Sequence, residues 1–135
     1  MVNINLNAAD GERVNLWRAN LQGAELWGAQ LQGALLRDAK LQGANLMTAQ
    51  LQRANLGTAE LQGADLWSTN LQGAFLTGAD FTDAKWLQAA DFTDAWAWAD
   101  QPPIGLDGIK IDLCVYDDAI HIFSEKPSPC IPPGE

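Results

Sequence analysis

The chain has 135 residues, enough for one ordinary domain, and 47% of them are hydrophobic, yet it carries a net charge of −9. It contains no run of 18 apolar residues that could cross a membrane, and its first residues lack the basic start and apolar stretch of a secretory signal. We therefore expect an acidic cytoplasmic protein that does not associate with membranes.

The first predicted element is a long internal repeat. LQGA begins at Leu21, Leu31, Leu41, Leu61 and Leu71, with LQRA at Leu51, and between these units a further leucine recurs so that one appears every five residues, nearly always two places after an alanine. A period of five suits neither a helix, which repeats every 3.6 residues, nor a strand, which repeats every two. The pattern favours a chain that turns after each five residues, with Leu and Ala facing a central axis.

The residue at the third place of each L-x-G-A unit predicts the turn. In a type II turn this position needs a positive φ, which glycine adopts without steric cost. We therefore predict a positive φ at Gly23, Gly28, Gly33, Gly43, Gly63, Gly73 and Gly78. Where another residue takes this place, we predict turns without a positive φ, namely at Arg18, Asp38, Thr48, Arg53, Thr58 and Ser68.

The outward residues indicate how many fives make one coil. In a twenty-residue coil, columns of stacked positions hold residues of one kind, such as Gln22, Gln42 and Gln62 in one column and Gln32, Gln52 and Gln72 in another. A fifteen-residue coil would instead place different residue types in the same column. We expect neighbouring coils to lie about 4.8 Å apart, as paired strands do. Gln side chains in register could then bond along each column, like the amide ladders of other stacked β structures.

These five-residue units resemble those of the pentapeptide repeat proteins, whose pattern is A-(D/N)-L-x-x, from Ile4-Asn5-Leu6 through Ala84-Lys85-Trp86. The resemblance implies an all-β fold, a right-handed quadrilateral β-solenoid with four pentapeptides per coil and the Leu and Ala positions inward. Many such proteins come from cyanobacteria. One branch of the family resembles DNA in shape and charge and modulates DNA gyrase.

The later part of the chain departs from the repeat. ADFTDA begins at Ala79 and again at Ala90, eleven residues apart, so we expect an inserted residue near Ala89 that bulges the last coil. The expected organisation is a solenoid over residues 1–100 and a capping segment with a Pro-rich tail over residues 101–135. Alternating apolar residues over 109–115 and at Ile120 and Ile122 predict two short strands around Asp117, a hairpin-like cap, with a short helix over 117–123 as the alternative.

Few residues suggest a catalytic or metal-binding site. His121 is the only histidine, and no nucleophile elbow, phosphate-binding loop or HExxH motif is present. Solvated carboxylates are the favoured interpretation of the two DFTD copies, with a weak Ca²⁺ site over Asp80, Asp83, Asp91 and Asp94 as the alternative. Cys114 and Cys130 are either two thiols or a disulfide. We expect no enzyme activity, no cofactor and no metal.

The candidate functional surface is a column of outward apolar residues, Trp27, Met47, Trp67 and Leu87, each directly after an inward position. A second partial column holds Leu35, Phe75 and Trp96. A contiguous exposed apolar strip tends to mark an interaction surface. We therefore predict a non-catalytic protein-interaction or scaffold protein that binds a protein partner or a second copy. The open alternative is that these side chains cover the repeat edges or pack under the carboxy-terminal tail.

The acidic charge raises a second hypothesis, a DNA mimic that modulates gyrase or another nucleic-acid-binding protein. The charge distribution weakens it. Residues 1–99 hold ten carboxylates against six Lys or Arg, whereas residues 100–135 hold seven against two, so the tail carries the greater charge density. No outward column of the repeat is uniformly acidic, and we expect no direct binding to nucleic acid.

Overall fold

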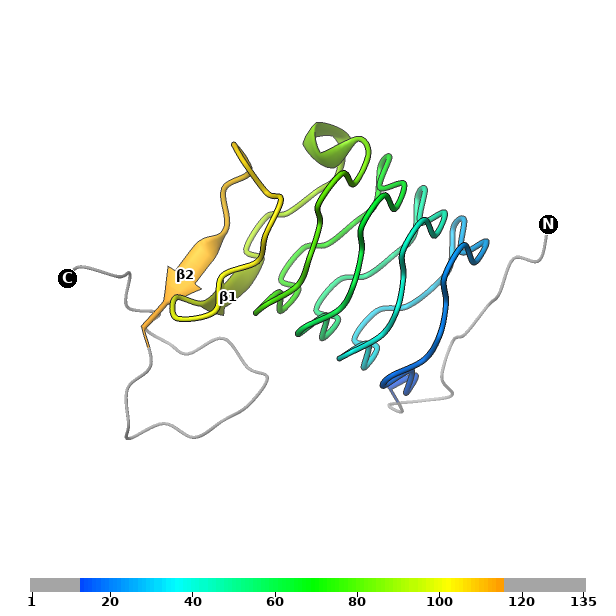
Figure 1. The fold of residues 1–135 in the computed structure, drawn as a ribbon, viewed down its shortest axis with the longest axis horizontal. Helices are drawn as coiled ribbons and strands as arrows, with labels where there is room; N and C mark the ends of the chain where they lie inside the picture. Colours follow the sequence, from blue (N-terminus) through cyan, green and yellow to red (C-terminus); the bar gives the residue numbers. More distant parts are fainter. Residues whose placement is uncertain (1–12, 116–135) are drawn as a thin grey trace.

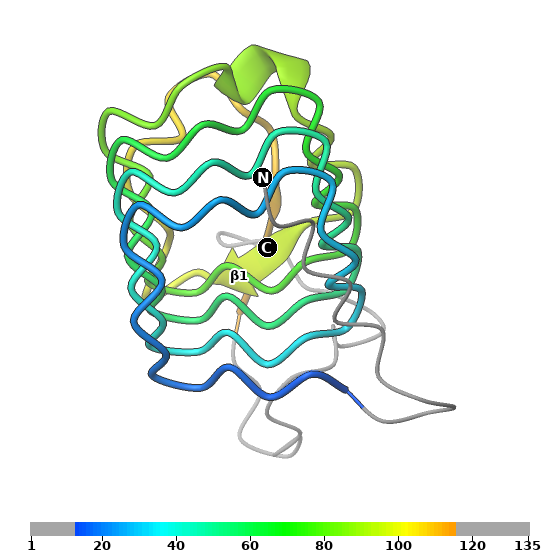
Figure 2. The same ribbon diagram turned by 90° about the vertical axis from the view of Figure 1, so that its right-hand side faces the viewer.

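The computed structural model describes residues 13–115, and residues 1–12 and 116–135 lie outside this description. The chain winds into coils that stack side by side along the long axis of the molecule (Figure 1). Viewed from the end, each coil lies over the one before it (Figure 2). The molecule is an all-β solenoid.

Parallel bridges set the length of each coil. Every fifth residue pairs with the residue twenty places later, in an unbroken series from Asn15↔Leu35 to Asp65↔Lys85. The backbone N–H of each inward leucine donates to a carbonyl of the next coil, as from Leu51 to Asn70 at 2.8 Å. The predicted coil length of twenty residues is confirmed.

The core consists of the inward leucine and alanine side chains of the repeat. The inward leucines from Leu26 to Leu76 and nearly all of the alanines between them are fully buried in one cluster. Burying apolar side chains is worth about 25 cal/mol per Å², so a column of leucines that touches the coil on either side supplies most of the stabilisation. The predicted inward placement of Leu and Ala is confirmed.

The turns are uniform, and this corrects one prediction. Each unit closes with a bond from the alanine N–H to the leucine carbonyl three residues before, as from Ala64 to Leu61 at 3.0 Å. All seven predicted glycines have a positive φ. The six other residues of that position also have a positive φ, between 53° and 58°, so the prediction of a different turn there was wrong; they are Arg18, Asp38, Thr48, Arg53, Thr58 and Ser68.

Stacking explains why the turns do not follow the residue type. The N–H of the third turn residue donates to the carbonyl of the second turn residue in the next coil, at 2.9 Å both for Gly43 to Gln62 and for Thr48 to Trp67. A turn of another geometry would leave these groups unpaired, and an unmade hydrogen bond costs about 1–3 kcal/mol when the group is buried. The ladder therefore imposes the left-handed conformation on residues that disfavour it.

The Asn or Asp that precedes many of the leucines also has a structural role. Its side-chain oxygen accepts the N–H of the residue two places later, as from Gly57 to Asn55 at 3.0 Å and from Thr82 to Asp80 at 2.9 Å. That N–H belongs to the second turn residue and makes no backbone hydrogen bond. Short polar side chains that bond locally to the backbone are favoured in turns for this reason.

The predicted glutamine ladders do not form between described residues. Gln32 and Gln52 donate to Gln30 and Gln50 within the same coil, at 2.9 and 2.7 Å. Gln42 donates to Glu60, and Gln62 donates to Asp80 at 2.7 Å. The neighbouring column contains carboxylate and amide oxygens. These oxygens accept the hydrogen bond that each Gln amide would otherwise donate to the next Gln of its own column.

The expected insertion is present, and the structure places the extra residue at Trp86. Five residues separate Lys85 from Asp91, whereas four separate Asp65 from Asn70, the residues with which these two pair. Trp86 adopts a φ of 61° and precedes the 3₁₀ helix η1 (Leu87–Ala89). The bridges then resume one residue out of step, at Asn70↔Asp91 and Phe75↔Trp96.

The coil continues past residue 100 without the repeat motif. Ile104 pairs with Asp80, and β1 (Trp96–Trp98) pairs in parallel with β2 (Asp112–Cys114). A strand is therefore present within the predicted segment 109–115, and its partner here is the preceding coil (Figure 1). The predicted hairpin around Asp117 and its helical alternative lie outside the described residues.

A substitution at Ser68 tests the imposed turn. Ser68 is exposed and has a φ of 53°, and the left-handed conformation costs an L-residue about 1–2 kcal/mol. Ser68→Gly should therefore raise the free energy of unfolding, by about 0.5–1 kcal/mol after the greater freedom of glycine in the unfolded chain is subtracted. Urea unfolding measures it. Gln72→Gly, at an exposed position without a positive φ, is the control and should destabilise; a gain at both sites would contradict the explanation.

Candidate interaction surface

Three of the four predicted surface residues lie in register on consecutive coils. Trp27, Met47 and Trp67 each occupy the second place of a turn, and hydrogen bonds of 2.9 Å from Gly28 to Met47 and from Thr48 to Trp67 stack these turns directly. Trp27 is 48% exposed and Trp67 is 44% exposed, while Met47 between them is half-buried. We call these three residues the Trp column.

Leu87, the fourth predicted member, does not belong to this surface. It is partly buried and packs against the main core from η1. The extra residue is the cause, because Trp86 takes the place that an inward leucine would have and turns outward, leaving Leu87 to fill the core. Trp86 is 60% exposed. The eleven-residue spacing of the two ADFTDA copies was the sequence signal for this exchange.

The second partial column is not an exposed surface. Leu35 is half-buried, and only 9% of Phe75 and 2% of Trp96 is exposed. The two rings lie 4.6 Å apart between centroids, and Trp98 and the buried Cys114 pack with them. Phe75 and Trp96 lie outside the main core cluster, but the prediction that they form an exposed apolar column was wrong.

Gly57 contributes to this second cluster by lacking a side chain. A Cβ at Gly57 would lie 3.2 Å from the Phe75 ring and 3.1 Å from the Asn55 side-chain oxygen. The small residue thus leaves space for the Phe75 ring beside it. Cys114 takes part in a disulfide and is not a free thiol, whereas Cys130 lies outside the described residues.

Polar residues border the Trp column along one side. The Asn45 amide donates to Glu25 at 2.9 Å, while the Asn45 oxygen accepts the N–H of Met47 and Asp65 accepts that of Trp67. These bonds fix the polar row to the backbone that carries the apolar side chains. An apolar centre beside a hydrogen-bonding rim is the usual composition of a protein–protein interface.

Another exposed tryptophan, Trp17, belongs to a different column and is engaged within the chain. Its ring nitrogen donates to Asp38 at 3.2 Å, and the Arg18 guanidinium lies 4.4 Å from its ring centroid. The hydrogen bond from Thr58 lowers the pKa of Asp38, and the bond from Trp17 and the charges of Arg37 and Arg18 act in the same direction. The sequence did not single out this cluster, since its members are spread over three coils.

The DFTD carboxylates serve the turns. Asp80 and Asp91 accept the N–H groups of Thr82 and Thr93, both at 2.9 Å, and hydrogen bonds from these threonines lower the pKa of each carboxyl. Over residues 13–115 no group of three or more His, Cys, Asp or Glu side chains is placed to hold a metal ion. His121 lies outside that range. No helix within it has the length and apolar character needed to cross a membrane.

The stacked parallel coils and identical turns define a β-solenoid repeat protein with a five-residue unit. A family model described as pentapeptide repeats matches eight copies, over residues 1–38, 29–57 and 59–95. The chain therefore belongs to the pentapeptide repeat family. No curated protein matches it.

Several solved pentapeptide repeat proteins are similar to this chain. Rfr23 from the cyanobacterium Cyanothece 51142 is 33% identical over 67% of this chain and 65% of its own, with a TM-score of 0.47. HetL from Nostoc sp. strain PCC 7120, a protein involved in heterocyst differentiation regulation, is 36% identical over 69% of this chain and 42% of its own, with a TM-score of 0.47. The alr5209 protein from Nostoc PCC 7120 is 33% identical over 74% and 82% of the two chains, with a TM-score of 0.38. This chain thus spans less than two thirds of the length of the first two.

Proposed function

We propose that this protein is a non-catalytic interaction or scaffold protein, and that the Trp column is the surface through which it binds a protein partner or a second copy of itself. The observation that carries the proposal is the exposure of Trp27 and Trp67 on either side of Met47, in register on three consecutive coils. A cytoplasmic location is part of the proposal.

The solenoid makes this column suitable for binding. Its backbone is fixed by the ladder of hydrogen bonds between coils, so the side chains are presented on a rigid face that loses little entropy when a partner binds. Tryptophan is enriched among the residues that dominate binding energy, and methionine adapts to irregular surfaces. An exposed stack of such residues costs solubility, which a binding function would explain.

The shape of the scaffold is the second part of the proposal. We infer a right-handed quadrilateral coil in which each five-residue unit forms one side. Four bridges per twenty-residue coil support the four sides, and membership of the pentapeptide repeat family supports the hand. In this arrangement the Trp column would occupy one of the four faces along its length.

The alternative function is a DNA-mimicking modulator of DNA gyrase or of another nucleic-acid-binding protein. The net charge of −9 is the observation in its favour. Against it, Lys40 lies between Asn20 and Glu60 in one bridged column, and Lys85 follows Asp65 in another. The two columns thus lack the continuous row of negative charge that a phosphate backbone presents.

Replacing all three residues of the Trp column by glutamine tests the proposal. Glutamine already occupies this turn position elsewhere in the repeat, so the fold should be retained. Binding should weaken by about thirtyfold or more, because loss of one aromatic anchor in a hot spot can cost about 2 kcal/mol. Pull-down from the native organism and sedimentation velocity measure partner binding and self-association, with circular dichroism to confirm the β signal.

Trp17→Gln is the matched control, since it removes an exposed tryptophan from another column. It should leave partner binding and oligomeric state unchanged. A folded triple variant that keeps every partner and the same oligomeric state would show that the Trp column is not the binding surface. Loss of the fold in the triple variant would instead identify the column as packing.

A further inference from the structure

The last coil that the structure describes is shorter than the one it covers. Ile104 pairs with Asp80, and Asp112 pairs with Trp96. Fifteen residues separate Asp80 from Trp96, but only seven separate Ile104 from Asp112. Among residues 13–115, the segment 104–112 therefore takes a short path across the preceding coil and leaves residues 83–94 of that coil without a complete neighbour. We call residues 83–94 the open edge.

The open edge has backbone groups whose equivalents are paired with the next coil elsewhere in the repeat, except at the Ser68 N–H. The N–H groups at the inward position and at the third turn position normally donate to the next coil, as from Leu51 to Asn70 and from Arg53 to Gln72. The equivalent N–H groups of Phe92 and Asp94 have no hydrogen-bond partner within residues 13–115, and the Ala90 carbonyl accepts none there. Such an edge is a ready template for another strand.

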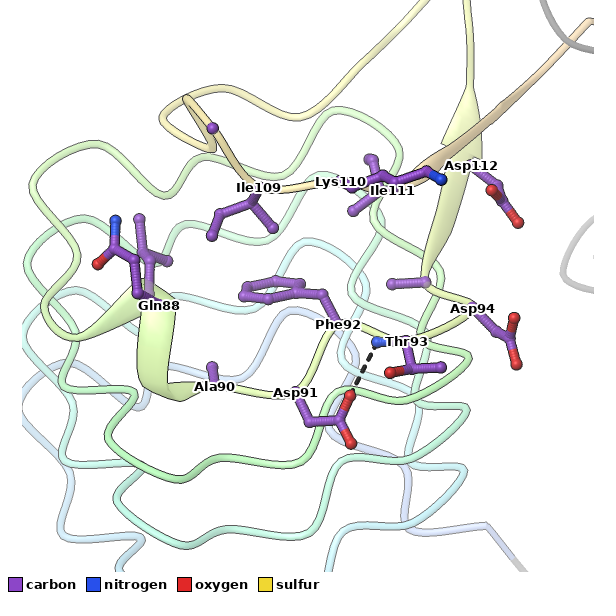
Figure 3. A pocket seen from close by; sticks show the side chains of 13 residues that line it. Gln88, Ala90, Asp91, Phe92, Thr93, Asp94, Ile109, Lys110, Ile111 and Asp112 are labelled. Carbon is purple, nitrogen blue, oxygen red and sulfur yellow. Dashed lines mark hydrogen bonds between the residues drawn. The ribbon is translucent and has the colours of Figure 1, made fainter.

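A cavity of about 470 Å³ lies beside this edge, between residues 87–95 and the segment 108–112. Figure 3 shows Phe92 and Ile109 facing one another across it, with Ile111 on the same wall as Ile109. Phe92 is buried and Ile109 and Ile111 are partly buried against the main core. The cavity thus offers an apolar floor next to unpaired backbone groups.

The charges around the cavity indicate which peptide would fit. Asp91, Asp94 and Asp112 line it with a single cation, Lys110. Asp91 and Asp94 are exposed. A second copy of this chain, with a net charge of −9, is disfavoured by repulsion, and so are residues 116–135, which contain four carboxylates and one lysine. Complementary charge favours a basic partner.

We propose that the open edge is a second docking site, separate from the Trp column, which binds one extended segment of a partner protein that bears Lys or Arg between small apolar residues. The segment adds a strand beside residues 90–94, pairs with the backbone groups of Phe92, Asp94 and Ala90, and places an apolar side chain against Phe92. Main-chain bonds provide affinity in this mode of recognition, and pockets for alternate side chains provide specificity.

The test uses the full chain and a fluorescein-labelled peptide of sequence KVKVKV, followed by fluorescence anisotropy. Binding should be saturable and should slow amide hydrogen exchange at Phe92 and Asp94. The same peptide with alternate backbone nitrogens methylated keeps its charge but loses donors, and should bind at least about tenfold more weakly, which corresponds to about 1.4 kcal/mol. The acidic peptide EVEVEV should not bind.

Two single variants separate this site from general attraction to an acidic protein. Asp94→Asn removes a charge beside the cavity and should weaken binding several-fold, whereas Glu25→Gln, a matched neutralisation on an early coil, should have no effect. The triple glutamine variant of the Trp column should bind the peptide as wild type does. The proposal is overturned if the peptide does not bind, if N-methylation or Asp94→Asn leaves affinity unchanged, or if the triple variant abolishes binding.

Discussion

Leu51→Ala should lower the free energy of unfolding by about 2–5 kcal/mol, the range measured when a buried leucine is truncated. Leu51 is fully buried and stands in the middle of the core, with complete coils before and after it. Its side chain is covered by leucines from both neighbouring coils, and the surrounding backbone is held by hydrogen bonds at every unit. The cavity left by the substitution can therefore collapse little, which favours the upper part of the range.

Gln52→Ala is the control for this prediction. Gln52 follows Leu51 directly but is half-buried, and its amide bonds only to Gln50. Its truncation should cost about 1 kcal/mol or less, the net value of a single hydrogen bond. Urea unfolding followed by circular dichroism gives both values. Equal losses at the two sites would contradict the inward and outward assignment.

Deleting Trp86 should leave the protein folded, whereas deleting Trp67 should abolish cooperative unfolding. Without Trp86, Lys85 would be followed directly by Leu87, and the distance between the two ADFTDA copies would return to ten residues. Leu87 already packs against the core, so it can fill the inward position of a regular unit. The 3₁₀ helix η1 should then be replaced by an ordinary turn.

The deletion of Trp67 shortens a five-residue unit that has no extra residue. Four residues connect Asp65 to Asn70 in the regular coil, and three cannot span the same side while keeping the ladder on both neighbours. The two variants lose the same residue type one coil apart, which makes them a matched pair. Thermal unfolding and far-UV circular dichroism distinguish them, and similar melting of both variants would refute the placement of the extra residue at Trp86.

The two proposed surfaces have different physical origins. The Trp column arises from side chains that the repeat leaves exposed, and sequence stacking at twenty residues was enough to align Trp27, Met47 and Trp67. The open edge arises from the backbone, because the short segment 104–112 leaves the N–H groups of Phe92 and Asp94 without a hydrogen-bond partner within residues 13–115. No pattern of residue types marks an unpaired backbone group, so the sequence did not predict it.

Residue periodicity by itself determined the coil. A leucine every five residues cannot be buried by an isolated helix or strand, and only a twenty-residue coil gave columns of similar side chains; these two constraints fix the core and the register of residues such as Leu51. They are local and repetitive, so they can be counted in the sequence without knowledge of any long-range contact.

The tertiary structure alone decided the turns, the glutamine partners and the end of the solenoid. Thr48 adopts a positive φ because its N–H pairs with the turn of the next coil, and Gln62 bonds to Asp80 because a carboxylate of the neighbouring column lies within hydrogen-bond reach. Phe75 and Trp96 occupy outward positions of the repeat but become buried against Trp98 and Cys114. In each case the outcome depends on which group of a neighbouring coil competes for the same space or hydrogen bond, and that competition exists only after the coils have stacked.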